Sequence, residues 1–490
     1  MKSKFFWGSA ILCCALGLGT VSCSDDDDKE FSIEETFTKE GITTDYTGGI
    51  YKIKVNGNSE WEASVPDNAK WVNLVVKNGK GGQQVVILVE PKYDGISRNT
   101  ELTVKSGSDS FKIPVKQIVS RDNATDGLDV VVSKGLGNGY NVEDYTYTSA
   151  SVLNVAAIKA VMETDPIKYN RLLNEDYKNV LKAEDAQGDS LEDKTDTLGV
   201  KISCNISYGK FAFGVSGEIS TGEKRVSNAK SYHLSANYPL YIGTVNLRAV
   251  LSAYNEWLDE GKPQTDAKGN ADYRSCLIQS DFLKISNELE EIITADQVNY
   301  TNYMDNWEVM TICSEIMENY GPAIITKSTI GGSYVLDCQY DSTYTNETFD
   351  INKATVTAKI KAAVFELDAK VSVDYNKQME ETLKHANFKA EIYGGGLTER
   401  QNVYSKFLAR EFNDKTAINT WAQSLTIDKD LNKNKTELIN SEISGIWSFL
   451  GRNSQRVVMQ YIADQTDYPK YPIVRKLLVR SGVIKETVTK

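Results

Sequence analysis

Hydrophobic and polar residues alternate in two different ways along the chain. From about Thr36 to Gln117, short runs alternate with a period of two and are separated by clusters of turn-forming residues such as NGNS and KYDGIS. The runs are GGIYKIKV, WVNLVV, QQVVILVE, TELTVKS and FKIPVKQ. This spacing predicts a β-sandwich of roughly 80–90 residues, which we place at residues 36–119.

Residues 128–490 mix helical and strand patterns. ASVLNVAAIKAVMETDP predicts a helix that ends before Pro166, and the stretch from DFLKISNELEE to MENYG predicts helices leading into Gly321. SYHLSANYPLYIGTVNL and FKAEIY predict strands, and LTERQNVYSKFLAREF predicts a helix. The expected fold class is therefore α+β, with the polar stretch SRDNATDG linking the sandwich to a larger second domain.

The segment YGPAIITKSTIGG, Tyr320 to Gly332, has strand-forming β-branched residues between glycines. An ordinary strand has no need of a Gly-Gly pair, because glycine weakens a strand interior. The pair Gly331 and Gly332 therefore predicts a bend, a bulge or a second backbone passing very close.

The stretch from Ala354 to Tyr375 fits a helix and a pair of strands equally well. Its two halves of eleven residues each alternate with a period of two, and each is about as long as a tilted membrane-spanning strand. Several of the same apolar residues also share one helical stripe. The apolar residues of these patterns include Val356, Ile360, Val364, Phe365, Leu367, Val371 and Val373.

The stretch VKISCNISYGKFAFGVSGEIS, Val200 to Ser220, repeats this double pattern. Its glycines weaken a helix by roughly 1 kcal/mol each relative to alanine, so its first half also fits a permanent core strand. The apolar residues of this pattern are Tyr208, Phe211, Phe213, Val215 and Ile219. For both stretches the alternative is an amphipathic β-hairpin that never moves.

The N-terminus predicts export. Lys2 and Lys4 precede an apolar stretch, and TVSC places small residues before Cys23. This resembles a bacterial lipoprotein signal, with residues 1–22 removed and Cys23 acylated, although Thr20 stands where leucine is usual. The acidic residues of the tether, 23–35, resemble the surface-export signal of Bacteroidetes lipoproteins, and a plain solvated tether is the alternative. We expect an outer-membrane lipoprotein at the cell surface or released from it.

Composition argues against several classes of function. The formal charge of −12 and the lack of a Lys/Arg cluster argue against nucleic acid as a partner. With only His233 and His385, histidine-based metal sites and catalysis are not expected, and DKDLNKNKTELI departs from a calcium loop at two key positions. We expect no enzyme activity, no cofactor and no metal. Four cysteines remain after export, either as disulfides or as free thiols: Cys204, Cys276, Cys313 and Cys338.

The first domain resembles the BACON family of β-sandwiches. Gly48-Gly49, Trp61 and Trp71, Arg98 before NTELTV and the closing Gln117 carry this resemblance. It implies contact with carbohydrate or mucin, and a spacer that holds the second domain away from the membrane is the alternative.

The second domain resembles the MACPF (membrane-attack-complex/perforin) family. Tyr320, Gly321, Gly331 and Gly332 match the spacing of the family signature, whereas Pro322 to Ile324 replace its Thr-His-aromatic residues. GLGNGY at 135–140, YGGG at 393–396, WAQSL at 421–425 and ISGIWSFL at 443–450 also resemble family segments. The resemblance implies a bent antiparallel central sheet flanked by helical clusters, with two regions that refold into membrane-spanning hairpins. It thereby makes the apolar residues given above for the stretches 200–220 and 354–375 the candidates for membrane insertion, with their side chains facing lipid.

Two functions follow from these resemblances. The first is a pore-forming protein that oligomerises on a target membrane through a receptor or glycan, as a toxin against related strains. The resemblance is to secreted antimicrobial MACPF proteins of Bacteroidales. The second is a non-lytic adhesin or glycan- and mucin-binding lipoprotein in which the second domain is a scaffold.

Overall fold

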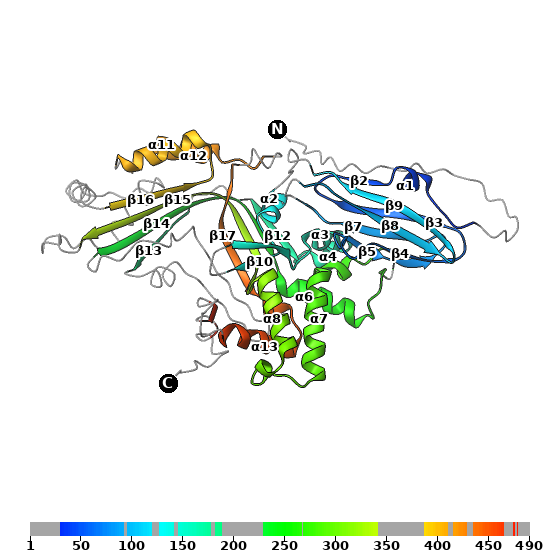
Figure 1. Ribbon diagram of the computed structural model, residues 1–490. Coiled ribbons are helices and arrows are strands. Elements are labelled where there is room, and N and C mark those ends of the chain that lie inside the picture. Colours follow the sequence, from blue (N-terminus) through cyan, green and yellow to red (C-terminus); the bar gives the residue numbers. More distant parts are fainter. Residues whose placement is uncertain are drawn as a thin grey trace.

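A β-sandwich and a larger α+β domain make up the computed structural model (Figure 1). The structure describes residues 30–92, 96–119, 127–141, 146–177, 182–188, 229–266, 268–341, 387–409, 415–428, 435–464, 474, 475 and 478.

The sandwich consists of a four-stranded sheet, β1-β3-β7-β5, and a five-stranded sheet, β2-β9-β8-β4-β6. Its elements are β1 (Ser32–Ile33), α1 (Glu35–Lys39), β2 (Ile42–Thr44), β3 (Gly49–Asn56), β4 (Glu60–Ser64), β5 (Val72–Val76), β6 (Asn78–Lys80), β7 (Gln84–Val89), β8 (Arg98–Ser106) and β9 (Asp109–Gln117). Strand β1 lies within the stretch assigned to the tether, so the sandwich begins earlier than residue 36. The reason is that Ile33 is buried and the ring of Phe31 packs 5.2 Å from that of Phe111.

Strand β7 is buried on both of its faces, although most sandwich strands bury only one. Val85 and Ile87 are fully buried, and their outward-facing neighbours Val86 and Leu88 are buried as well. Strand β5, the neighbour of β7, contacts the short helix η1 of the second domain, and one continuous cluster of buried apolar residues extends across both domains. The sandwich is therefore docked onto the second domain, since a strand that is apolar on both faces needs cover on both.

The second domain is built on an eight-stranded antiparallel sheet with the order β11-β10-β15-β14-β12, in which β13 also pairs with β14, and β16 and β17 also pair with β15. The strands are β10 (Asn138–Asn141), β11 (Thr146–Ser151), β12 (Leu173–Tyr177), β13 (Lys182–Gly188), β14 (Ala229–Val245), β15 (Ala323–Asp341), β16 (Asn387–Tyr393) and β17 (Glu437–Gly445). The long strands β14 and β15 curve visibly along their length (Figure 1).

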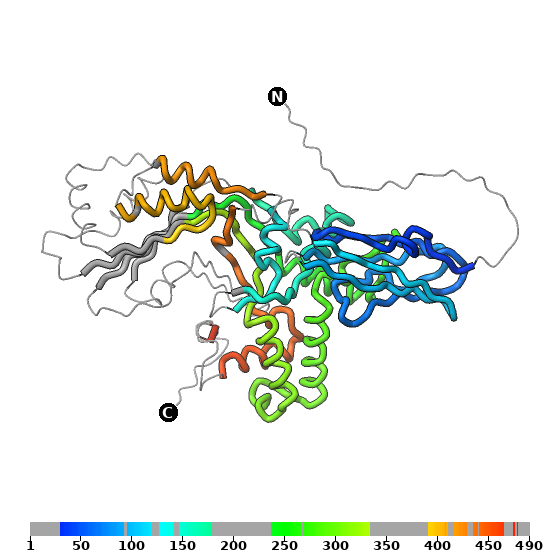
Figure 2. The backbone as a smooth tube through the Cα atoms, turned by 45° about the horizontal axis from the view of Figure 1, so that its top comes forward, coloured from blue at the N-terminus to red at the C-terminus, as the bar shows by residue number. Residues whose placement is uncertain are grey.

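Helices lie on both sides of this sheet, as Figures 1 and 2 show: α11 and α12 on one side, and α7, α8 and α13 on the other. The helices are α2 (Gly127–Ser133), α3 (Val155–Thr164), α4 (Pro166–Tyr169), α6 (Leu247–Asp259), η1 (Tyr273–Cys276), α7 (Ser280–Ala295), η2 (Tyr303–Asp305), α8 (Trp307–Tyr320), α11 (Leu397–Leu408), α12 (Lys415–Ser424), η4 (Ile446–Phe449) and α13 (Arg452–Asp464). Asn154, Asn246 and Asn306 cap α3, α6 and α8 through their side-chain oxygens.

The predicted fold class is confirmed: a small β-sandwich precedes a domain with a large antiparallel sheet and flanking helices. None of the helices in the described ranges is both long and apolar enough to cross a bilayer.

Candidate functional site

Two segments rich in glycine meet where β15 begins. Gly321 ends α8 with φ of +71°, a conformation that favours glycine, and its N–H donates to the carbonyl of Met317 at 3.0 Å. A Cβ on Gly321 would lie 2.7 Å from the carbonyl oxygen of Tyr140, and one on Gly139 would overlap the carbonyl of Tyr320. The GLGNGY segment and the Tyr320-Gly321 pair are therefore glycine-rich because their backbones pack directly against each other.

A second close approach occurs at Gly331 and Gly332, in the middle of β15. A Cβ on Gly331 would overlap the carbonyl oxygen of Tyr238 on β14, and the β14–β15 register shifts between Pro239 and Tyr241. The predicted close backbone and bulge are thus both present. The strand continues beyond the pair to Asp341, because the glycines relieve crowding without interrupting the hydrogen-bonded ladder.

Helix α12 packs against this second glycine position through the side chain of Trp421. A Cβ on Gly332 would lie 2.6 Å from Trp421 Cζ2 and equally close to Leu425 Cδ2, and one on Gly395 would lie 2.6 Å from Trp421 Cδ1. The indole is fully buried, and its Nε1 donates to the carbonyl of Gly394 at 3.0 Å. We call Trp421 and the glycines Gly331, Gly332, Gly394 and Gly395 the bend joint.

The sheet next to the bend joint contains buried polar side chains. Ser328, Ser333 and Asn237 are buried, and Asn237 faces Ser333 across β14 and β15. Among the described residues, no protein group pairs with Ser328 Oγ, Ser333 Oγ or Asn237 Oδ1. The sheet is therefore polar at this point, although it is buried.

Four neighbouring strands, in the order β13-β14-β15-β16, stop at the same end of the sheet. At this end Gly188 pairs with Ser231, Ala229 with Asp341, and Gln339 with Asn387. Residues 189–228 connect β13 to β14, and residues 342–386 connect β15 to β16. Each of the two stretches that fit both a helix and strands therefore lies in a connection between two paired antiparallel strands. Both connections leave the sheet at the same end of these strands.

The predicted site residues fall into two groups. Tyr320 is the last residue of α8 and Gly321 ends that helix, just before β15, whereas Gly331 and Gly332 lie in the middle of β15 at the bend joint. The structure therefore does not bring the signature together into one cluster. The lipidation candidate and the membrane-insertion candidates lie outside the described residues: Cys23, Tyr208, Phe211, Phe213, Val215, Ile219, Val356, Ile360, Val364, Phe365, Leu367, Val371 and Val373.

Of the four cysteines left open, Cys276 and Cys313 are free and buried. Cys204 and the side chain of Cys338 lie outside the part of the chain that the structure describes.

We expect neither Cys276 nor Cys313 to react with iodoacetamide in the native protein at pH 8. Burial disfavours the thiolate and raises the pKa of Cys276 to about 11 and that of Cys313 to about 12. The reactive thiolate of Cys276 is then roughly one part in a thousand at pH 8. Mass spectrometry before and after unfolding in urea measures this, and rapid alkylation of either residue in the native state would contradict it.

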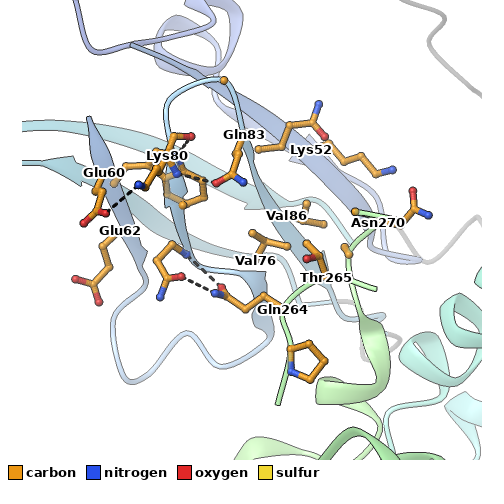
Figure 3. Close-up of a pocket in the computed structure, with 18 of the residues that line it drawn as sticks. Lys52, Glu60, Glu62, Val76, Lys80, Gln83, Val86, Gln264, Thr265 and Asn270 are labelled. Atoms are coloured by element: carbon orange, nitrogen blue, oxygen red, sulfur yellow. Dashed lines mark hydrogen bonds and ion pairs between the residues drawn. The ribbon is translucent and has the colours of Figure 1, made fainter. Parts of the chain in front are cut away.

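A cavity of about 1300 Å³ lies where the sandwich meets the second domain. Glu60, Glu62 and Lys80 of the sandwich lie on one side and Lys52 and Asn270 on the other (Figure 3). In its wall, Gln264 Oε1 accepts hydrogen bonds from the N–H groups of Lys77 at 2.7 Å and Asn78 at 3.3 Å. The sequence did not indicate a role for Gln264, because it lies more than 180 positions from Lys77 and Asn78.

Polar contacts also join the two domains beside this cavity. Lys70 of the sandwich forms an ion pair with Asp281, and Asn154 Nδ2 donates to Glu90 at 3.4 Å. Burial raises the pKa of Glu90, although a hydrogen bond from Asn73 acts in the opposite direction.

The solved structures that resemble this chain include MACPF/perforin-like proteins. Residues 60–117 match the family model described as "BACON: Putative binding domain, N-terminal", which confirms the BACON resemblance for that segment.

Three solved structures illustrate these neighbours. GNIP1Aa from Chromobacterium piscinae is 13% identical, with 67% of this chain and 54% of that chain covered and a TM-score of 0.41. A "Putative cell invasion protein with MAC/Perforin domain" from Bacteroides thetaiotaomicron is 12% identical, covering 67% and 59%, with a TM-score of 0.36. Astrotactin-2, a vertebrate "perforin-like membrane protein", is 10% identical, covering 66% and 96%, with a TM-score of 0.26.

The chain thus spans less than two thirds of the length of the first two structures. At these identities the similarity concerns the fold, and no function is transferred from it. Among curated proteins, none matches this chain by sequence.

Proposed function

We propose that this protein is a surface or released lipoprotein that oligomerises on a target membrane and inserts β-hairpins to form a pore, as a toxin against related bacteria. The observation that carries the proposal is the end of the sheet at which β13, β14, β15 and β16 stop together. Both stretches with double periodicity join neighbouring strands there, so extending them would continue β13, β14, β15 and β16 as four adjacent antiparallel strands.

The lengths of the two connections fit this proposal. They contain 40 and 45 residues, and a hairpin that crosses a bilayer twice needs about 18–22 residues. About ten residues therefore remain on each strand to reach from the sheet to the membrane. In the inserted form, one side of each strand would face lipid and the other would line a wet lumen with lysines and carboxylates.

Pore formation by this route requires many copies. Within the described part of the sheet, β13 pairs only with β14 and β16 pairs only with β15, so the four-stranded ribbon has two open edges. In a bilayer each unpaired backbone group costs several kcal/mol, and only a closed barrel removes all of them. We infer a homo-oligomer in which β16 of one copy is followed by β13 of the next.

The bend joint would control the change. Straightening the curved pair β14–β15 would alter the gap into which Trp421 fits, so α12 would have to shift before the two connections extend.

Dye release from liposomes made with lipids of susceptible cells tests the proposed function. We expect the protein to sediment with these liposomes and to release the dye, with a steep dependence on protein concentration because many copies are needed. Binding without any release would contradict the proposal. It would leave the alternative of a binding protein at the cell surface.

That alternative is favoured by one observation, the polar cavity between the domains. Amide, hydroxyl and charged side chains converge there from both domains, which suits a ligand rich in hydrogen-bonding groups, such as a glycan. Binding of host or bacterial glycans that is lost on Gln264→Ala, with no dye release, would support it.

A further inference from the structure

The turn between α7 and α8, residues 296–308, consists of the connecting loop and the first two residues of α8, and it exposes three large apolar side chains. Tyr300 is 39% exposed, Met304 58% and Trp307 72%. We call residues 296–308 the α7–α8 tip; Figure 1 shows it at the end of these helices that points away from the sheet. Because the three exposed side chains come from within eight residues, they mark the tip as a candidate interaction surface.

The tip is rigidly built, so the exposure is not a consequence of an unfolded loop. Val298 and Tyr303 are buried, and the hydroxyl of Tyr303 donates to Asp464 Oδ2 at 3.0 Å. Asn306 caps α8 through the N–H groups of residues 308 and 309 and donates to Asp296 Oδ2 at 2.9 Å. Val298, Tyr303 and Asn306 therefore anchor the tip, while the side chains of their neighbours face outward.

The α7–α8 hairpin is strongly acidic. From Ser280 to Tyr320 it contains nine Asp or Glu residues and one basic residue, Lys284, a formal charge of −8. Around the tip, Asp296, Asp305 and Glu308 are all exposed. One basic group contacts the tip: the guanidinium of Arg456 lies 4.2 Å from the centre of the Tyr300 ring.

We propose that the α7–α8 tip docks a partner protein whose surface is basic and contains an apolar pocket for Trp307 and Met304. Trp and Tyr are the residues most often found at the centre of protein interfaces. The surrounding carboxylates would steer a basic partner toward the tip, and they disfavour an anionic membrane surface. This proposal does not rest on pore formation, because the tip does not belong to the end of the sheet at which the two connections leave.

Two synthetic amphipathic peptides of equal length, one of Lys and Leu and one of Glu and Leu, test this docking surface with the full chain. We expect the cationic peptide to bind at least tenfold more tightly than the acidic one. Trp307→Ser combined with Met304→Ser should weaken its binding at least tenfold. Asp305→Asn combined with Glu308→Gln should reduce the salt dependence of binding.

The matched control is Ile167→Ser, because Ile167 of α4 is 91% exposed without belonging to the tip. This variant should bind the cationic peptide like the wild type, and thermal unfolding checks that every variant is folded. Equal binding by the Trp307/Met304 variant and the wild type would overturn the proposal. So would sedimentation with phosphatidylglycerol vesicles that depends on Trp307 and Met304, since the partner would then be a membrane.

Discussion

The oxidised Gly332→Cys/Leu425→Cys protein is expected to bind target liposomes normally and to release no dye from them. A Cβ on Gly332 would point at Leu425 Cδ2 from 2.6 Å, so cysteines at these two positions face each other. Leu425→Cys removes the leucine methyl groups and makes room for the new side chain, whereas the Trp421 ring, also 2.6 Å away, has to shift slightly. The disulfide would hold α12 against β15 at the bend joint. If α12 must shift before the two connections extend, the lock stops the change after binding, and the loss of dye release should be complete.

Reduction supplies the internal control for this lock. Adding a thiol reductant to the bound, locked protein should restore dye release, and Leu425→Cys alone should release dye with or without reductant. Full release by the oxidised double variant, with the disulfide verified by mass spectrometry, would show that α12 can stay in place during insertion. In that case the bend joint would be only a structural contact.

The second large effect is expected for Trp421→Ala, which should lower the free energy of unfolding by about 3–5 kcal/mol. The indole is fully buried among glycines that have no side chains to fill the space, and its hydrogen bond to Gly394 is lost with it. Because the same contact holds the bent form, dye release by the surviving folded protein should also become faster.

Urea unfolding measures the stability change, and Trp307→Ala is the matched control. Trp307 is mostly exposed, so its replacement should change the free energy of unfolding by no more than about 0.5 kcal/mol. A loss below about 1 kcal/mol for Trp421→Ala would mean that the neighbouring side chains close over the gap and that Trp421 does not key α12 into the sheet.

Local patterns in the sequence were enough to predict much of the fold. The period-two runs match β3, β5, β7, β8 and β9, and the helical patterns match α3, α7, α8 and α11. The spacing of Gly331 and Gly332 correctly indicated a close backbone, because only glycine tolerates that approach. These are properties of short segments, and they are visible without knowing what lies next to the segment in space.

Contacts between distant segments were not predictable in the same way. Nothing in the pattern around Gly332 points to Trp421, and nothing around Asn78 points to Gln264, since each pair is brought together only by the tertiary fold. The sequence does contain one indication of the contact between the domains. The five consecutive apolar residues of β7, Val85 to Val89, indicate a strand covered on both faces. It distinguishes a docked sandwich from a freely tethered spacer.

The α7–α8 tip shows the same division between local and tertiary information. The excess of acidic residues from Asp281 to Glu318 can be counted in the sequence. Which of the aromatic residues is buried could not be predicted, because Tyr303 and Trp307 have similar neighbours in the sequence. Tyr303 is buried because its ring packs against Tyr461 of α13, whereas Trp307 is exposed.

The central claim is that residues 354–375 become membrane-spanning strands, and a scan with an environment-sensitive fluorophore tests it most directly. Single cysteines would be placed in turn from position 356 to 364, in a variant whose Cys204 and Cys338 are serines; Cys276 and Cys313 remain, because they are buried. On susceptible liposomes, the label should report an apolar environment at 356, 358, 360, 362 and 364 and an aqueous one at the positions between. A signal that stays aqueous throughout, or that repeats every three to four residues, would contradict insertion as strands.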